Sequence, residues 1–217
     1  MTDAQQIFSQ IADSLEGGNA QSVKDLIEKA LAQNIGAETI LNQGLVAGMN
    51  RVGDKFKKNE IFIPEVLIAA RAMKSGMEII KPLLALANVK SRGKIIIGTV
   101  KGDLHDIGKN IVSMMLEGSG FDVVNMGTDV SIDQILDHIE KTKPDVVGLS
   151  ALLTTTMVVM KDVIDTLEKN DLRKSVKIIV GGAPITQAYA DEIRADGYAP
   201  DAASSVDLVR KLLGLKN

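Results

Sequence analysis

The residues best suited to chemistry lie in one short stretch, TVKGDLHDIGKNIVS, at positions 99–113. Asp103, His105 and Asp106 stand close together there, with a glycine on either side, and His105 is one of only two histidines in the chain. An apolar run, KIIIG, precedes the stretch and a helical pattern follows it, so the histidine falls on a predicted strand-to-helix turn. Such turns, at the carboxyl ends of strands, are where α/β proteins bind ligands.

A nucleoside triphosphate site is a poor match for this stretch. Five residues rather than four separate Gly102 from Gly108. Asn110 follows Lys109 where a P-loop has the Ser or Thr that holds magnesium. The aspartates beside the histidine would also repel a phosphate, so another kind of ligand is expected.

A bare metal ion is also a poor match. The second histidine, His138, belongs to another predicted helix, and the chain has no cysteine. One imidazole cannot hold zinc or iron, which need at least three protein ligands. It suits a metal that brings its own equatorial ligands, as in a haem or a corrin. Asp103 could hold the other imidazole nitrogen, and Asp106 could cap the next helix. At this point an ordinary loop histidine remains an alternative.

The composition excludes several function classes. The 217 residues include 25 Lys and Arg against 28 Asp and Glu, and aromatic residues are only 3% with no Trp. This balance provides neither a basic patch nor a stacking surface, so no nucleic-acid partner is expected. No apolar run approaches the roughly 18 residues of a membrane span, and the acidic N-terminal stretch does not resemble a secretory signal. We therefore expect a cytoplasmic protein without a membrane partner.

The first part of the chain carries only helical periodicity. We predict an α-helical bundle cap over residues 1–88, built of four helices with short connections. The third helix is expected at 39–52 and the fourth at 63–86, with Pro82 ending or kinking the last one. The polar residues 89–93 are expected to form a linker.

After the linker, short apolar runs alternate with helical patterns, which is typical of a parallel sheet covered by helices on both faces. We predict an α/β flavodoxin- or Rossmann-like domain over residues 94–217 with a five-stranded parallel sheet. The patterns locate four strands, at 94–100, 122–127, 145–150 and 176–182. They also place helices at 107–118 and 131–142, a helix that follows the third strand and runs to 170, and helices at 184–195 and 205–213.

Three of the predicted strand ends carry unusual segments: GDLHDIG, SALLTTT and GGAP. Together they contain D-x-H-x-x-G, S-x-L and G-G, with 41 residues between the first two elements and 28 between the last two. This pattern and spacing resemble the fingerprint of cobalamin-binding domains that hold the cofactor base-off and histidine-on. The segment GMNRVGDKFKKNEIFIPEVLIAARAMKSGMEIIKPLL resembles the helical cap of methionine synthase and of small corrinoid proteins. The resemblance thus covers nearly the whole chain.

The resemblance assigns a role to each matching residue. His105 would be the lower axial ligand of cobalt, Asp103 would orient it, and Thr156 would complete a proton relay. Ser150 and Thr154 would line the slot for the displaced nucleotide tail. The full expected cofactor-binding set is Asp103, His105, Asp106, Gly108, Ser150, Leu152, Thr154, Gly181 and Gly182. A tight strand-to-helix turn is a second reason for the glycine pair, and a helix start is a second reason for Thr156.

The resemblance also implies a methyl carrier of a corrinoid methyltransferase system. Such a protein accepts a methyl group on Co(I) from a substrate-specific methyltransferase whose donor is methylamine, glycine betaine, methanol or an aryl methyl ether. A corrinoid:acceptor methyltransferase passes the group to a tetrahydrofolate-type or thiol acceptor, and a corrinoid reductive activator is a third partner. The cap would cover the methyl group, with Phe62, Leu67 and Met73 as candidates, although bundle core is an alternative for each. No substrate-cleaving site is expected in the chain. The alternative function is a cobalamin-dependent sensor or regulator acting through a partner protein.

Overall fold

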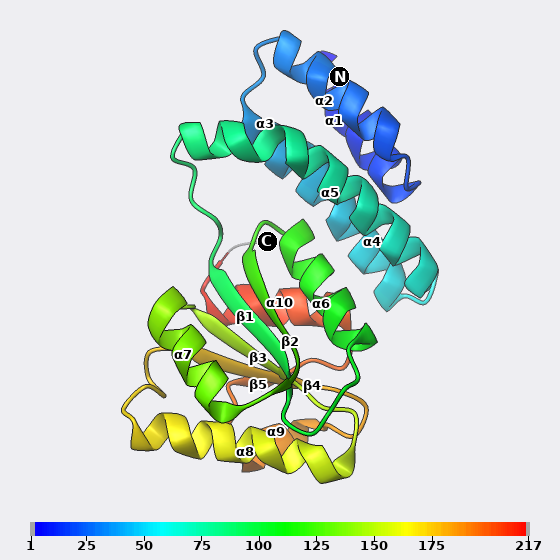
Figure 1. The fold of residues 1–217 in the computed structure, drawn as a ribbon. Coiled ribbons are helices and arrows are strands. Elements are labelled where there is room, and N and C mark those ends of the chain that lie inside the picture. The colour runs from blue at the N-terminus through cyan, green and yellow to red at the C-terminus, as the bar shows by residue number, and fades with distance from the viewer. Residues whose placement is uncertain (1–2, 216–217) are drawn as a thin grey trace. The chain divides into compact units, whose positions relative to one another are not determined.

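The structure is a computed structural model that describes residues 3–215. The chain divides into two compact units whose boundary lies between Ser91 and Arg92, with the short segment Glu117–Gly120 grouped with the first. The order of the elements along the chain is drawn in Figure 1. No helix within the described residues is both long enough and apolar enough to cross a membrane.

The first unit is helical throughout. Its elements are α1 (Asp3–Glu16), α2 (Ala20–Ala32), α3 (Ala37–Ile40), the π-helical η1 (Leu41–Val46), α4 (Ala47–Lys57) and α5 (Ile63–Leu86). Asn19 caps α2 by accepting a hydrogen bond from the Ser22 N–H. The α1 side chains that share one face, Ile7, Ile11 and Leu15, are buried. The predicted helical cap is therefore confirmed.

Two details of the cap differ from the prediction. The third helical segment begins at Ala37 and ends at Lys57, longer than expected, because a π-helical stretch lets the chain continue without a break. α5 continues through Pro82 to Leu86, so the proline does not end the helix. A proline removes one backbone hydrogen bond, and the apolar side chains of Ile80 and Leu84 on either side of it are buried.

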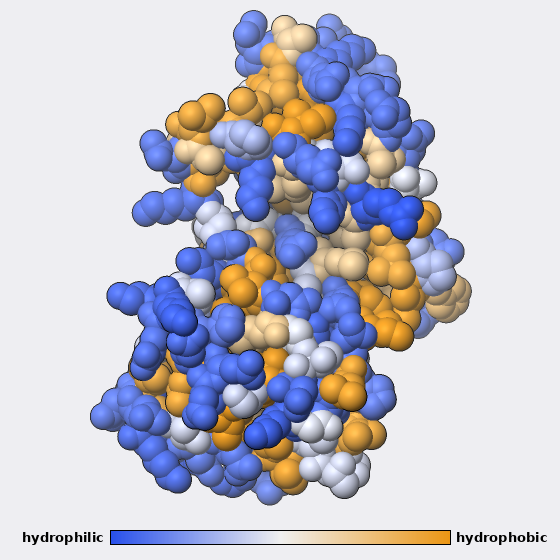
Figure 2. Space-filling model, viewed as in Figure 1, coloured by the Kyte–Doolittle hydropathy of each residue, from blue (hydrophilic) through white to orange (hydrophobic). Residues whose placement is uncertain are grey.

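The start of α5 exposes large apolar side chains. Phe62 and Leu67 are 63% and 41% exposed, whereas Met73 is 4% exposed. The burial of Met73 favours the core alternative for that residue. The orange patches in Figure 2 show that apolar side chains interrupt an otherwise hydrophilic surface.

The second unit is a five-stranded parallel sheet, which confirms the predicted fold. The strands are β1 (Lys94–Val100), β2 (Asp122–Val130), β3 (Val146–Ser150), β4 (Lys177–Gly181) and β5 (Gly197–Tyr198), in the order β2-β1-β3-β4-β5. The helices are α6 (Ile107–Gly118), α7 (Ile132–Thr142), α8 (Thr154–Lys169), α9 (Gln187–Glu192) and α10 (Ala202–Leu212). Figure 1 shows α7, α8 and α9 on one face of the sheet and α6 and α10 on the other.

Several element boundaries in this unit differ from the prediction. β2 extends to Val130 rather than ending at 127. α9 begins only at Gln187, because the Thr186 side chain caps it by accepting from the Tyr189 N–H. α10 begins at Ala202 rather than 205, since Asp201 caps it through the Ser204 N–H. β5 is only two residues long and had no pattern to locate it.

The strand order places a topological switch point between β1 and β3. From β1 the chain crosses to β2 on one side, and then returns to β3 on the other side of β1. Ligands of open α/β sheets bind outside the carboxyl ends of the strands at such a point. The segments that follow β1 and β3 therefore carry the candidate site.

Limited trypsin digestion tests the proposed linker at 89–93. These residues lie between α5 and β1 and outside both elements. We expect the first cleavage after Lys90 or Arg92, giving two stable fragments that mass spectrometry identifies. Lys94 is the internal comparison, because it lies in β1 and its Nζ donates to the Thr142 carbonyl. Early cleavage elsewhere, with 89–93 intact, would contradict the linker.

Candidate functional site

The three strand ends that carry the sequence motifs are aligned in the sheet. Thr99 near the end of β1 pairs with Ser150 at the end of β3, and Ser150 pairs with Gly181 at the end of β4. The segments that follow these residues therefore leave the same edge of the sheet. The parallel arrangement brings together residues that are about 50 positions apart in the sequence.

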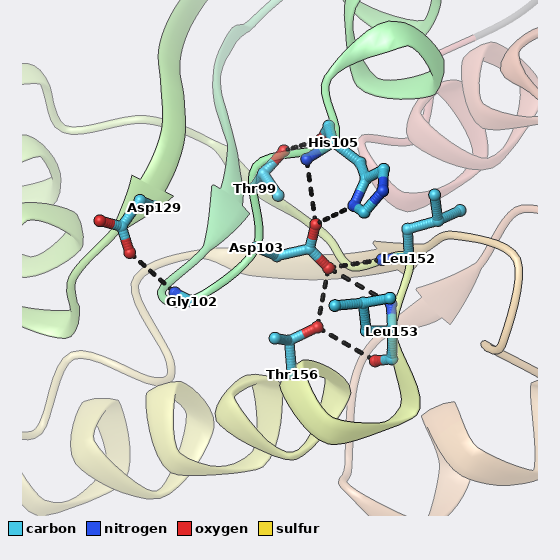
Figure 3. A network of polar contacts seen from close by, with 8 residues as sticks. All are labelled: Thr99, Gly102, Asp103, His105, Asp129, Leu152, Leu153 and Thr156. Atoms are coloured by element: carbon cyan, nitrogen blue, oxygen red, sulfur yellow. Dashed lines mark hydrogen bonds and ion pairs between the residues drawn. The ribbon is translucent and has the colours of Figure 1, made fainter.

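Asp103 is the centre of the hydrogen-bond network at this edge (Figure 3). Its side chain is fully buried. Its Oδ1 lies 2.8 Å from His105 Nδ1 and accepts from the His105 N–H at 3.1 Å. Its Oδ2 accepts from the Leu152 and Leu153 N–H groups, at 2.8 and 3.3 Å, and from the Thr156 hydroxyl at 2.7 Å. One carboxylate thus joins the loop after β1 to the loop and helix after β3.

These hydrogen bonds keep Asp103 ionised. Burial by itself raises the pKa of this carboxyl group, because desolvation disfavours the charged form. The opposing hydrogen bonds from Leu152, Thr156 and His105 outweigh that effect and hold the pKa of Asp103 far below its ordinary value. An ionised carboxylate only accepts hydrogen bonds. The proton between the two side chains therefore lies on His105 Nδ1.

In the neutral imidazole, this arrangement makes Nε2 the nitrogen whose lone pair can bind a ligand. The side chain of His105 is 52% exposed, in contrast to its buried partner. The backbone of His105 is also held, because the Thr99 hydroxyl donates to its carbonyl oxygen at 2.8 Å. An oriented, half-exposed imidazole with a carboxylate on its other nitrogen is the usual form of a metal-ligating histidine.

Large apolar side chains are exposed on the same two segments that carry this network. Leu104 and Ile107, from the loop and helix start after β1, are 73% and 69% exposed. Leu152 and Leu153, after β3, are each 42% exposed. Such apolar surroundings with one metal-binding nitrogen fit a broad, largely apolar macrocycle that brings its own metal. The residues present thus fit the corrinoid that the sequence pattern implies.

The remaining predicted site residues lie nearby with different partners. Ser150 and Thr154 take no part in the Asp103 network, and Thr154 is exposed at the start of α8. Asp106 stands directly before α6, and its carboxylate accepts from the side-chain amide of Asn110 at 2.9 Å. At Gly108 an added Cβ would meet no atom within 4 Å, so the protein itself does not require a glycine there.

Gly182 is required by the backbone itself. Its φ is +130°, and an added Cβ would lie 1.8 Å from the Ala151 carbonyl oxygen. Ala151, which begins the loop after β3, also donates its N–H to the Gly181 carbonyl. A tight strand-to-helix turn, the second reason given for the glycine pair, therefore explains the glycine at 182 without any bound ligand.

Replacing Gly182 with alanine is expected to displace the loop after β3. Loss of stability on the order of 2–4 kcal/mol is expected, since the new Cβ must push the Ala151 carbonyl away. Gly108→Ala is the matched control and should change the free energy of unfolding by less than about 1 kcal/mol in the cofactor-free protein. Denaturant unfolding of both variants measures this, and equal effects would contradict the assignment.

Asp129 is a site residue that the sequence did not reveal. It is the next-to-last residue of β2 and has a left-handed backbone conformation, with φ of 54°. Its carboxylate accepts from the Gly102 N–H at 2.7 Å (Figure 3). Its own N–H donates to the Asp103 carbonyl at 3.0 Å. Both bonds hold the loop that carries Asp103 and His105. The only signal was an aspartate in the turn segment GTDVS, which is common in loops.

Comparisons with known proteins identify the family of the chain. The B12 binding domain family matches residues 93–207, and a second B12 binding domain family matches residues 7–81. The dimethylamine corrinoid protein 3 of Methanosarcina acetivorans is 42% identical over 213 residues, covering 98% of this chain and 100% of that protein. A cobalamin-binding protein from Desulfitobacterium hafniense has a crystal structure that matches with a TM-score of 0.80 at 31% identity, covering 94% of this chain and 98% of that one.

A second solved structure is similar over the whole chain. It is the methanol:cobalamin methyltransferase complex from Methanosarcina barkeri, with a TM-score of 0.87 at 28% identity, covering 100% of this chain and 82% of that one. Fold and site together define a class of protein, a helical cap followed by an α/β B12-binding domain. Within that class, the chain belongs to the corrinoid proteins of methyltransferase systems.

Proposed function

We propose that this protein carries methyl groups on a bound cobalamin between partner enzymes, with His105 as the lower axial ligand. The observation that carries the proposal is the link from His105 through Asp103 to Thr156, at the switch point of a B12-binding domain. When bound, the cobalt supplies a centre that accepts a methyl group from one partner and releases it to another. The chain itself binds and orients this cofactor.

The protein's own residues have three tasks in this proposal. His105 presents Nε2 to cobalt, with its orientation set by Asp103 on one side and by Thr99 at its backbone. Asp103 holds the Nδ1 proton, and the Thr156 hydroxyl donates to its other oxygen. Ser150, Thr154 and the glycines at 181–182 would line the slot for the displaced nucleotide tail. The exposed apolar start of α5 would shield the methyl group, through Phe62 and Leu67.

A methylated amine is the proposed donor class. The support is the name of the dimethylamine corrinoid protein, which aligns with 98% of this chain. The proposed partners are a substrate-specific methyltransferase, a corrinoid:acceptor methyltransferase for a tetrahydrofolate-type or thiol acceptor, and a reductive activator, all in the cytoplasm.

Methyl transfer to the cobalamin-loaded protein should occur with a dimethylamine-specific partner. Transfer only with a methanol-specific partner would assign a different donor.

Histidine labelling tests the ligand itself. The protein is loaded with hydroxocobalamin, reduced to the Co(II) form and examined by electron paramagnetic resonance with and without 15N-histidine. An axial 14N nucleus splits the signal into triplets, and 15N converts them to doublets. We expect doublets in the labelled sample, because a protein histidine has replaced the cofactor's own base. Triplets that persist in the labelled sample would contradict histidine ligation.

A further inference from the structure

Lys109 is a buried cation for which the proposed function has no role so far. It lies in the first turn of α6, four residues after His105, and is only 3% exposed. Its Nζ donates to the Oδ1 atoms of Asn110 and Asn125, at 2.7 and 2.6 Å. These short distances are typical of charge-assisted hydrogen bonds. Burial lowers the pKa of Lys109, and the nearby Asp106 carboxylate opposes that decrease.

The two asparagines do not depend on this ammonium group. Asn125 Oδ1 also accepts from the Gly127 N–H at 3.0 Å, and Asn110 Oδ1 also accepts from Asn125 Nδ2 at 2.9 Å. Asn110 Nδ2 in turn donates to Asp106 at 2.9 Å. An apolar side chain of the same length would therefore leave both amide oxygens with a donor. Since burying a charge is unfavourable by itself, stability alone does not explain a lysine at this position.

The charge of Lys109 is effective at a distance because it is shielded from water. Asp106, whose carboxylate opposes the decrease in the pKa of Lys109, is exposed and therefore screened by solvent. Lys101 is a contrasting cation, since it lies in the loop before His105 but is exposed. Coulomb interactions are several times stronger in a protein interior than in water. Lys109 thus places a shielded positive charge four residues along the chain from the imidazole that is proposed to bind cobalt.

We propose that Lys109 tunes the reduction of the bound cobalamin by favouring the cobalt state of lower positive charge. The proposal rests on the proposed function. Adding one electron to Co(II) gives Co(I) and lowers the charge on the metal by one, without forming or breaking a bond in the protein. A fixed cation nearby destabilises the more positive state. The Co(II)/Co(I) midpoint potential is therefore less negative with Lys109 than without its charge.

The test is a spectroelectrochemical titration of the full chain loaded with cobalamin, wild type against Lys109→Met. At a fixed potential near the wild-type midpoint, the ratio of Co(I) to Co(II) should fall several-fold in the variant, up to about tenfold for a poorly screened unit charge. Lys109→Arg, which keeps the charge, should stay near wild type. Lys101→Met is the matched control and should not change the ratio, because an exposed charge is screened.

The sign of the shift separates this role from a purely structural one. If Lys109 only stabilises the packing of α6 on β2, through its hydrogen bond to Asn125, its loss would make the His105 loop less ordered and weaken axial ligation. Weaker ligation makes the reduction of Co(II) to Co(I) easier. An unchanged midpoint, or a less negative one, in Lys109→Met would overturn the proposal. If that variant does not fold, Lys109→Gln must shift the midpoint in the same negative direction.

Two further measurements keep the result interpretable. Nuclear magnetic resonance titration of Lys109 in the cofactor-free protein should show an ammonium group at neutral pH, and a neutral amine there would overturn the proposal. Failure of the proposed function is detected separately, in the wild-type spectrum. If the wild-type spectrum shows no histidine nitrogen on cobalt, the proposed ligation by His105 is wrong. That outcome is distinct from an unchanged midpoint potential in the Lys109 variant, which overturns only the role of Lys109.

Discussion

His105→Ala is expected to leave a protein that still binds cobalamin but has lost its axial nitrogen signal. The slot proposed around Ser150, Thr154 and the glycines remains, so binding should weaken without vanishing. The loss in affinity should at least equal the roughly 10–100-fold that removing an outer partner of a metal ligand typically costs. The Co(II)/Co(I) midpoint should become less negative, because the imidazole stabilises the more oxidised cobalt.

Equilibrium binding, the paramagnetic resonance spectrum and the midpoint potential together measure this effect. His138→Ala is the matched control, because His138 lies in α7 and bonds through Nδ1 to the Gln134 carbonyl of its own helix. That variant should match the wild type in all three measurements. A wild-type spectrum in His105→Ala, or the same loss in His138→Ala, would show that the ligand has been wrongly assigned.

Asp103→Asn is expected to destabilise the cofactor-free protein by about 2–4 kcal/mol, because it disrupts a fully buried acceptor. The five groups that face Asp103 all donate hydrogen bonds to its two oxygens. In an asparagine, one of those oxygens becomes an NH2 group, which must face either His105 or the donors from Leu152, Leu153 and Thr156. Asp122→Asn, an exposed position at the start of β2, is the control and should stay within about 0.5 kcal/mol of wild type.

The effect of Asp103 on stability should depend on pH in a defined direction. Its pKa is lowered by folding, so as the pH falls the unfolded chain takes up the proton first. The stabilisation is fully present above the unfolded value of about 4 and is lost as the pH falls toward the folded pKa. The wild type should therefore exceed Asp103→Asn by a constant amount from pH 7 to about 5, and by less below pH 4. A difference that grows on acidification would contradict an ionised Asp103.

Much of the fold can be predicted from the sequence, because the patterns that indicate helices and strands are local. The switch from helical periodicity to alternating apolar runs near residue 90 predicted the helical cap and the parallel sheet, and both are confirmed. Boundaries were less accurate where a single side chain decides them. Thr186 and Asp201 cap α9 and α10, and the helical pattern alone does not distinguish these capping residues from other polar residues near the helix starts. The two-residue β5 is too short to carry a periodic signal.

The sequence by itself determined which segments form the candidate site. D-x-H-x-x-G, S-x-L and G-G follow three apolar runs at set spacing, and parallel strands bring such ends to one edge. Only the tertiary structure decided how these residues interact. Asp103 is buried and accepts from Leu152 and Leu153, about 50 residues away, while Asp129 holds the same loop from β2. Backbone donors carry no residue-type signal, and burial depends on packing, so neither could be read before the chain was folded.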